Sequence, residues 1–142
     1  RLLYKFLQEK GAYRRYLWNY WNNKGKERYD KFPNGNKEAI IGILEKYGMA
    51  GYFDEVVGST LDGSINAKCD VIKEAFRRMN IRNDEELSHV VMVGDRKYDI
   101  LGAKNFGMDS IGVLYGHGSR EELEQAGATK IAETVSALKE IL

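Results

Sequence analysis

The sequence has 142 residues, with 22 Lys and Arg against 21 Asp and Glu, and a formal net charge of +1 at pH 7. This length suffices for one domain with a hydrophobic core, and the near-zero charge argues against a protein that binds nucleic acid over its whole surface. There is no run of about 18 apolar residues to predict a transmembrane helix, and no charged-then-apolar leader to indicate secretion. The single cysteine, Cys69, cannot form an internal disulfide, so we expect a cytoplasmic protein. The lack of a long apolar run leads us to expect no membrane partner.

Residues 1–32 differ in composition from the rest of the chain. They hold nine of the sixteen aromatic residues, and nine Lys or Arg against three acids. Apolar residues recur at helical spacing, which predicts amphipathic helices near residues 2–9 and 13–23, interrupted at Gly11. Such a segment either stacks on nucleic-acid bases and holds phosphates, or packs its aromatic face inward and leaves its lysines outside. We favour packing, because helical spacing already accounts for most of the aromatic positions.

The next segment predicts a helix, a short strand and a second helix. Pro33-Asn34-Gly35-Asn36 is a turn cluster that precedes a helix over 37–47. Residues 52–57 predict a short strand, and the polar stretch 59–66 predicts a loop. A helix then begins near Lys68. Its apolar positions, which share one face, are Val71, Ile72, Ala75, Phe76 and Met79.

The sequence is organised around residues 90–100. Val90–Val93 is a short, continuous apolar run rich in β-branched residues, which is typical of a strand buried on both faces in a parallel sheet. Helical spacing of apolar residues then predicts a helix over 97–106. Asp95 therefore follows the carboxyl end of a strand, where open α/β sheets bind their ligands, and Asp99 lies about one helical turn further on.

Two interpretations of Asp95 and Asp99 are open from these residues. Two carboxylates that converge at a strand end suit a hard cation such as Mg²⁺, which takes oxygen ligands and is commonly held by one or two carboxylates plus a phosphate. Alternatively, Asp95 N-caps the helix, and Asp99 is a solvated acid of the first turn.

The remaining residues complete an alternating pattern. Residues 110–115 predict a second buried strand, and Ser119 and Glu122 have the spacing of a capping box for a short helix. Residues 130–131 predict a last short strand, and residues 134–142 a terminal helix. Strands that alternate with helices predict an α/β fold, a Rossmann-like parallel sheet flanked by helices.

Three segments of the predicted fold bring chemistry to the carboxyl edge of the sheet. Asp95 and Asp99 follow one strand and His117 follows the next, while Lys68 lies at the start of a helix. A helix N-terminus has free N–H groups and partial positive charge, so it suits phosphate, and Lys68 adds a cation there. We interpret His117 as a loop residue and Cys69 as a buried small side chain, because no histidine neighbours Cys69 in the sequence.

Several motifs, taken in order, resemble the haloacid dehalogenase (HAD)-like hydrolase superfamily, and within it the phosphoglycolate phosphatase-like proteins. The residues that carry the resemblance are YFDEVVGS at 52–59, Lys68, VMVGDRKYDILGA at 91–103, and agreeing segments at 111–116 and 121–123. The resemblance spans about residues 34–142. It implies a HAD-like α/β core over 33–142, with residues 1–32 as the remnant of a helical cap.

The resemblance also implies an activity, that of a Mg²⁺-dependent phosphatase acting on a small phosphorylated metabolite. It assigns Lys68 as the catalytic lysine that orients the nucleophile and holds the transferring phosphoryl group. Asn34 and Gly35 become phosphate-binding residues by the same resemblance. Asp95 becomes a metal ligand, and Asp99 supports it.

One motif of this superfamily is missing. The nucleophile of the family is the first Asp of Asp-x-Asp-x-Thr, at the end of a central strand beside Val90–Val93. No such motif occurs in the sequence, and Asp62-Gly63 lacks its context. We therefore expect an incomplete core in which Val90–Val93 lacks one neighbouring strand, and a truncated chain that is weakly active or inactive. The alternatives are a non-catalytic remnant and a nucleic-acid-binding module that uses the N-terminal segment; the sequence does not predict the oligomeric state.

Overall fold

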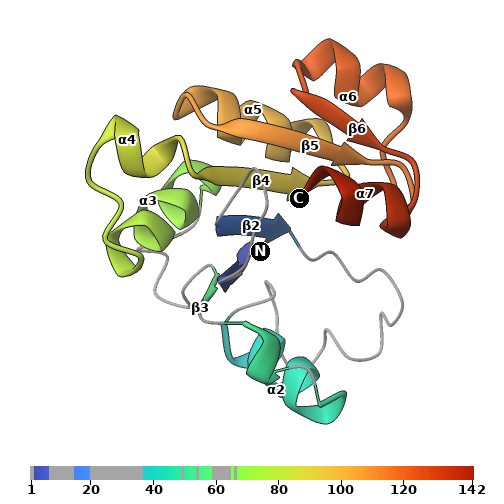
Figure 1. Ribbon diagram of the computed structural model, residues 1–142. Coiled ribbons are helices and arrows are strands. Elements are labelled where there is room, and N and C mark those ends of the chain that lie inside the picture. The colour runs from blue at the N-terminus through green and yellow to red at the C-terminus, as the bar shows by residue number, and fades with distance from the viewer. Residues whose placement is uncertain are drawn as a thin grey trace.

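The computed structural model describes residues 2–6, 15–19, 37–48, 50–53, 55–58, 65 and 67–142. Their elements, in chain order, are β1 (Leu2–Phe6), β2 (Arg15–Asn19), α2 (Lys37–Lys46), the 3₁₀ helix η1 (Ala50–Tyr52), β3 (Glu55–Val57), α3 (Lys68–Arg78), α4 (Asp84–Leu87), β4 (Val90–Gly94), α5 (Lys97–Asn105), β5 (Asp109–Val113), α6 (Arg120–Ala126), β6 (Lys130–Ala132) and α7 (Val135–Ile141). The strands form one six-stranded sheet, and helices lie on both of its faces (Figure 1). The α/β class predicted from the sequence is confirmed.

The order of the strands is β3-β1-β2-β4-β5-β6. β2, β4, β5 and β6 are joined by parallel pairing, whereas β1 runs antiparallel to both of its neighbours. Trp18 of β2 lies opposite Val93 of β4, and Val93 lies opposite Ile111 of β5. This register brings the carboxyl ends of β2, β4 and β5 to the same edge of the sheet, where ligand sites of α/β folds lie.

The N-terminal segment differs most from its prediction. The helices expected near residues 2–9 and 13–23 are wrong at residues 2–6 and 15–19, which form β1 and β2; the other positions of those two ranges lie outside the described residues. The remnant of a helical cap loses its support there. Leu, Tyr, Phe and Trp pack well in strands, and a spacing count over so short an aromatic run does not separate the two structures.

The neighbour that we expected β4 to lack is present. β2 pairs with β4 in parallel, from Arg15 opposite Val90 to Trp18 opposite Val93. A buried strand needs hydrogen-bond partners along both of its edges, because an unpaired buried backbone group loses its water without compensation. The hydrogen-bond partners that β4 requires therefore favour a strand over Arg15–Asn19, whose local sequence pattern fits either a helix or a strand.

Most of the remaining elements follow their predictions closely, but the strand expected over 52–57 is wrong at Tyr52, which lies in η1, and β3 spans only Glu55–Val57. The helices expected over 37–47, 97–106 and 134–142 are α2, α5 and α7, and the strands expected over 90–94 and 110–115 are β4 and β5. Gly127, with φ of 91°, ends α6 in the left-handed conformation that glycine adopts without strain. Among the helices of the described residues, none is long and apolar enough to cross a membrane.

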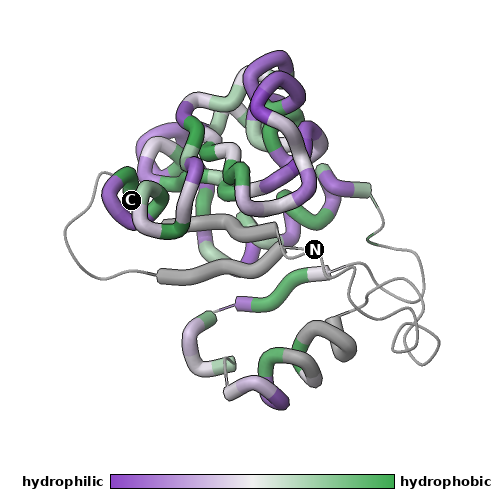
Figure 2. Tube along the Cα trace, turned by 90° about the vertical axis from the view of Figure 1, so that its right-hand side faces the viewer, coloured by the Kyte–Doolittle hydropathy of each residue, from purple (hydrophilic) through white to green (hydrophobic). Residues whose placement is uncertain are grey.

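The hydrophobic core has a layer on each face of the sheet, and apolar residues follow the strands between the helices (Figure 2). Val90 and Met92 pack with α3 and α5 on one face, and Val91 and Val93 pack with Leu138 of α7 on the other. β4 is therefore buried on both faces, as its apolar run predicts. In Figure 1, α7 lies in front of the sheet and α5 behind it.

Two apolar residues of the flanking helices are exposed. Leu101 of α5 is 42% exposed and Val135 of α7 is 67% exposed. In α5 the buried positions are Asp99, Ile100, Gly102 and Ala103. A charged residue therefore takes a place on the inner side of this helix, and Leu101 remains on its outer side.

Candidate active site at the carboxyl edge of the sheet

An ion pair joins α3 to α5 on one face of the sheet. The Lys68 Nζ lies 2.5 Å from Asp99 Oδ1, and the Asp99 side chain is fully buried while 23% of the Lys68 side chain is exposed. Lys68 is the first residue of α3, as predicted. A Cβ at Gly102 of α5 would lie 3.4 Å from Lys68 Cγ, so the glycine gives the lysine stem room to cross α5 and reach the carboxylate.

Asp99 is also held by the turn that precedes α5. Its Oδ2 accepts a hydrogen bond from the Arg96 backbone N–H at 3.3 Å. Gly94, the last residue of β4, packs directly against it: a Cβ at Gly94 would lie 2.3 Å from Asp99 Cβ and 2.5 Å from Asp99 Oδ2. The strand therefore ends on a residue without a side chain because a buried carboxylate occupies that space.

Asp95 follows β4 and has one carboxylate oxygen bound and one without a partner. Asp95 is buried, with 8% of the residue exposed. Its Oδ2 accepts a hydrogen bond of 2.8 Å from the His117 backbone N–H. Oδ1 is buried and has no hydrogen-bond partner among the described residues. A buried carboxylate oxygen without a donor is unfavourable, so this atom marks a place where a cation or a donor would be stabilised.

The interpretation as a solvated first-turn acid is wrong for Asp99, which is fully buried. The residue at the N-cap of α5 is Arg96, and not Asp95. Metal binding stays a prediction. Across residues 67–142 and the other described ranges, no group of three or more His, Cys, Asp or Glu side chains is arranged to hold a metal.

A second acid joins α6 to the start of α5. Glu122 Oε1 accepts hydrogen bonds of 2.9 Å from the Lys97 backbone N–H and from Arg96 Nε, and these two donors, the backbone one first, lower the pKa of the Glu122 carboxyl. The predicted capping box is half confirmed. Ser119 Oγ accepts from the Glu122 N–H at 3.1 Å, but the Glu122 carboxylate turns to the other helix.

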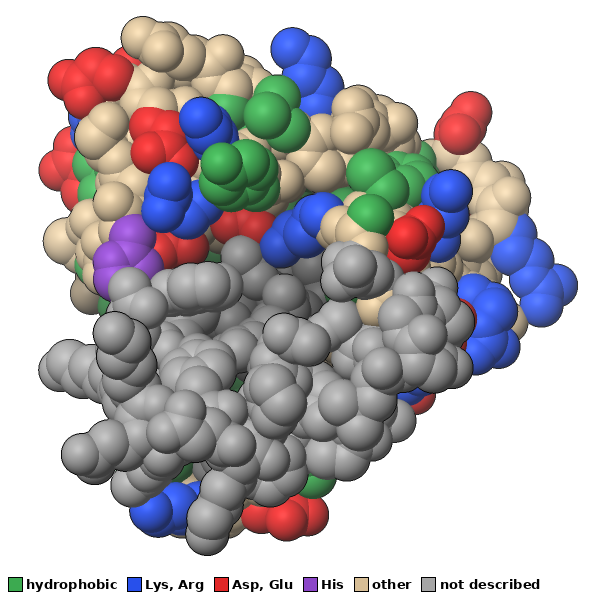
Figure 3. Space-filling model, turned by 180° about the vertical axis from the view of Figure 1, so that it is seen from behind, with side chains coloured by type: hydrophobic (Ala, Val, Ile, Leu, Met, Phe, Trp, Pro, Cys, Tyr) green, Lys and Arg blue, Asp and Glu red, His purple; other side chains and the backbone are tan. Residues whose placement is uncertain are grey.

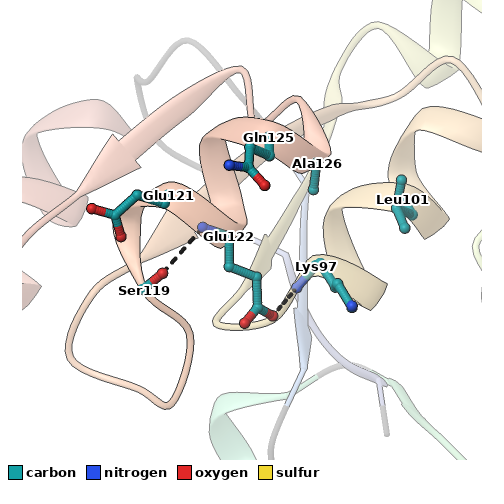
Figure 4. Close-up of a pocket in the computed structure, with 7 residues that line it drawn as sticks. All are labelled: Lys97, Leu101, Ser119, Glu121, Glu122, Gln125 and Ala126. Carbon is teal, nitrogen blue, oxygen red and sulfur yellow. Dashed lines mark hydrogen bonds between the residues drawn. The ribbon is translucent and has the colours of Figure 1, made fainter.

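Glu122 also lines a pocket between α5 and α6, where its carboxylate points at the backbone of Lys97 (Figure 4). Leu101 of α5 and Gln125 and Ala126 of α6 are among the other lining residues. Arg96 and Lys97, at the start of α5, already supply the hydrogen-bond donors to Glu122, so we interpret the pocket as the surface of a helix junction. The role of Glu122 there is to fix the start of α5, the helix that carries Asp99.

Basic and aromatic side chains gather on the outer side of the same turn. Arg96 and Lys97 lie over the ring of Tyr98, at 5.9 Å and 5.4 Å from its centroid, and Tyr98 is 60% exposed. Seen from behind, the described part of the surface carries hydrophobic side chains next to Lys and Arg (Figure 3). This cluster keeps positive charge beside the carboxyl edge of the sheet.

The other predicted site residues have different outcomes. Asn34 and Gly35, predicted to bind phosphate, lie outside the described residues, as does Asp62. Cys69 is partly buried, and its Sγ lies 3.8 Å from Asn105 Nδ2. His117 is an exposed loop residue, as the sequence predicts. The sequence did not predict that its backbone N–H donates to Asp95. No residue pattern encodes that contact, because any residue other than proline carries the donor.

Comparison with known proteins places this arrangement in a family. A family model described as HAD-hydrolase-like matches residues 68–140. Tyrosine-protein kinase PtkA of Mycobacterium tuberculosis is 31% identical over 102 residues, which are 70% of this chain and 34% of that protein. Phosphoglycolate phosphatase of Vibrio parahaemolyticus is 34% identical over 100 residues, which are 70% of this chain and 42% of that protein. The crystal structure of a predicted phosphatase from Clostridium acetobutylicum matches with a TM-score of 0.67 and 43% identity, covering 74% of this chain and 47% of that one.

The chain belongs to the HAD-like hydrolase family, because the matched range covers half of its residues and includes Lys68, Asp95 and Asp99. The resemblance seen in the sequence is confirmed at this level. The chain spans less than half of the length of the relatives named above, which fits an incomplete core. Its α/β sheet with flanking helices is the fold of these structural neighbours.

Proposed function

We propose that this chain carries the metal- and phosphate-binding part of a Mg²⁺-dependent HAD-like phosphatase that acts on small phosphate monoesters. The observation that carries the proposal is Asp95 Oδ1, a buried carboxylate oxygen without a partner among the described residues, at the carboxyl edge of the sheet. The Lys68–Asp99 ion pair supplies a cation from the neighbouring helix of the same layer. Phosphoglycolate phosphatases among the relatives support the substrate class.

The donor chemistry of the site fits Mg²⁺. The ion prefers oxygen ligands, and proteins commonly hold it by one or two carboxylates while water and substrate phosphate complete its shell. Asp95 Oδ1 is the oxygen that would bind it, whereas both Asp99 oxygens already contact Lys68 or the Arg96 N–H. When bound, Mg²⁺ would neutralise charge on the phosphate oxygens. We therefore assign Asp99 to positioning Lys68, and Asp95 to the metal.

Lys68 acts by charge and position. Its ammonium group is held by Asp99, and 23% of its side chain is exposed, so we infer that it can also donate to a phosphate oxygen at the sheet edge. Charge stabilisation of this kind is the main protein contribution to phosphoryl transfer. Asp99 keeps the ammonium from swinging into water, so that the donor is in place before the substrate arrives.

The nucleophile is the part that this chain does not supply. β2 occupies the place beside β4, and Trp18 lies opposite Val93, so Asn19 follows at the level of Gly94. The sequence from Asn19 to Lys26 contains no acid. We expect that the 142-residue chain binds Mg²⁺ and phosphate weakly and hydrolyses phosphate monoesters feebly or not at all, because covalent phosphoryl transfer needs a positioned nucleophile.

Calorimetric titration with Mg²⁺, followed by inorganic phosphate, tests the proposal. The wild type should bind both ligands, and Asp95→Asn should lose Mg²⁺ binding. Asp70→Asn is the matched control, since Asp70 is also an acid in the first turn of a helix, α3, and the proposal gives it no role in metal binding. Absence of Mg²⁺ binding in the wild type, or binding that survives Asp95→Asn, overturns the proposal.

An aryl phosphate assay tests the second half of the expectation. p-Nitrophenyl phosphate with Mg²⁺ should give no turnover above that of a Lys68→Met variant. Robust wild-type turnover that depends on Asp62 but not on Asp70 would show that the nucleophile lies in the 59–66 segment. That result would contradict the expected absence of a nucleophile.

A further inference from the structure

The loop after β5, Gly116-His117-Gly118, packs against Asp95. The His117 backbone N–H donates to Asp95 Oδ2 at 2.8 Å. A Cβ at Gly116 would lie 2.3 Å from Asp95 Cβ and 2.4 Å from its Oδ2, and a Cβ at Gly118 would lie 2.1 Å from the Asp95 backbone oxygen. Two glycines and one backbone donor therefore touch three different parts of the same aspartate.

We propose that this loop is the positioning element of the metal site, and that it determines Mg²⁺ affinity without contributing a ligand atom. The inference rests on the proposed function, because it gives Asp95 Oδ1 to the metal. The N–H of His117 holds Oδ2, which leaves Oδ1 as the oxygen that faces the site. Partners that orient a ligating side chain affect metal affinity almost as strongly as the ligands do.

The two glycines are required for space and not for backbone conformation. The positive-φ glycines among the described residues are Gly48, Gly107 and Gly127, so neither Gly116 nor Gly118 adopts the left-handed conformation that favours glycine. An alanine fits the backbone at either position, but its methyl group would overlap Asp95. The overlap at Gly116 falls on the carboxylate itself, and the overlap at Gly118 on the main chain that begins the turn into α5.

This difference gives each glycine a distinct expected effect. Gly116→Ala should push the Asp95 side chain out of its rotamer and break the hydrogen bond to the His117 N–H. Gly118→Ala should displace the backbone of the loop from Asp95, and with it the same donor. Both changes turn Oδ1 away from the direction in which it now points, although neither removes a carboxylate.

Calorimetric titration with Mg²⁺ tests the inference, with Gly51→Ala as the control. A Cβ at Gly51 would meet no atom within 4 Å, so this variant should bind Mg²⁺ as the wild type does. Gly116→Ala and Gly118→Ala should each raise the Mg²⁺ dissociation constant by roughly 10- to 100-fold. Amide hydrogen exchange gives a second readout, because exchange at His117 should accelerate in both variants and remain slow in the control.

A double-mutant cycle separates positioning from a general loss of folding. Asp95→Gly removes the Cβ and carboxylate that Gly116→Ala would strike, so the destabilisation by Gly116→Ala should be smaller in that background. Unchanged Mg²⁺ affinity in a folded Gly116→Ala variant, or strictly additive effects in the cycle, overturns the role of the loop. Absence of Mg²⁺ binding by the wild type overturns the proposed function, and the role of the loop with it.

Discussion

Replacement of Lys68 by methionine probes the ion pair that joins α3 to α5. Methionine keeps most of the apolar stem that crosses Gly102, so the change removes chiefly the ammonium group. Asp99 would then remain fully buried with its Oδ1 deprived of the Lys68 ammonium. Removing one partner of a fully buried ion pair costs about 3–5 kcal/mol, whereas one hydrogen bond to a charged group contributes about 1.5–3 kcal/mol.

The structure places this pair in the lower of those two ranges, near its upper end. Asp99 keeps the hydrogen bond from the Arg96 N–H, and the 23% exposure of the Lys68 side chain means that water can approach the place that the ammonium leaves. We therefore expect Lys68→Met to lower the free energy of unfolding by about 2–3 kcal/mol. Urea unfolding followed by circular dichroism measures the difference from the wild type.

Two comparisons make this expectation refutable. Lys73→Met removes an exposed lysine from the same helix and should change stability by less than about 0.5 kcal/mol. Asp99→Asn combined with Lys68→Met should be less destabilising than the sum of the two single changes, since the partners interact directly. A Lys68→Met variant as stable as Lys73→Met, or additivity in the cycle, would refute the argument.

Further predictions concern a salt-bridge network and two glycines. Arg77 and Arg78 donate to Glu74 and lower the pKa of its carboxyl from 4.5 to about 2. A lowered pKa in the folded state stabilises the fold above about pH 4.5, and this contribution is lost as the pH falls toward 2, so Glu74→Gln should cost about 1 kcal/mol at pH 7 in urea titrations. A difference from the wild type that stays constant down to pH 2 would contradict this. Gly127→Ala should lower the free energy of unfolding by about 1 kcal/mol, because φ is 91° at this position. Gly42→Ala should raise it by about 0.5–1 kcal/mol, because the glycine is exposed within α2 and a Cβ meets no atom within 4 Å; thermal unfolding that gives both alanines the same sign would contradict the pair.

Local pattern predicts the C-terminal two thirds of the fold well. Val90–Val93 contains no polar residue that could face solvent, so its sequence predicts a strand buried on both faces. In the structure every residue of β4 is buried. Lys68 begins α3, Asp95 follows β4 and Asp99 lies in the first turn of α5, as the strand and helix boundaries in the sequence predict. The structure joins Lys68 to Asp99 in an ion pair, whereas the roles that the family resemblance gives these residues stay predictions.

The N-terminal strands and the loop around Asp95 could not be predicted in the same way. Arg15–Asn19 has no alternation strong enough to exclude a helix, and its structure is decided by the partner that β4 requires along the sheet. The contact of His117 with Asp95 uses a backbone N–H, which no side-chain motif encodes. Glu122 illustrates a third limit: its spacing from Ser119 predicts a local cap, yet a donor on another helix attracts its carboxylate.

The order of the strands has a consequence for the behaviour of the sheet in solution. β1, β2, β4 and β5 have five residues each and lie inside the sheet, and its two outermost strands, β3 and β6, have only three each. Arg78 forms an ion pair with Glu55 of β3 and donates to the Val56 carbonyl oxygen, so side-chain charge occupies a backbone acceptor of an outermost strand. Short, charged outer strands offer a poor template for a strand of another molecule. The sheet thus carries its own protection against edge-to-edge aggregation, and an uncharged residue in place of Arg78 would weaken it.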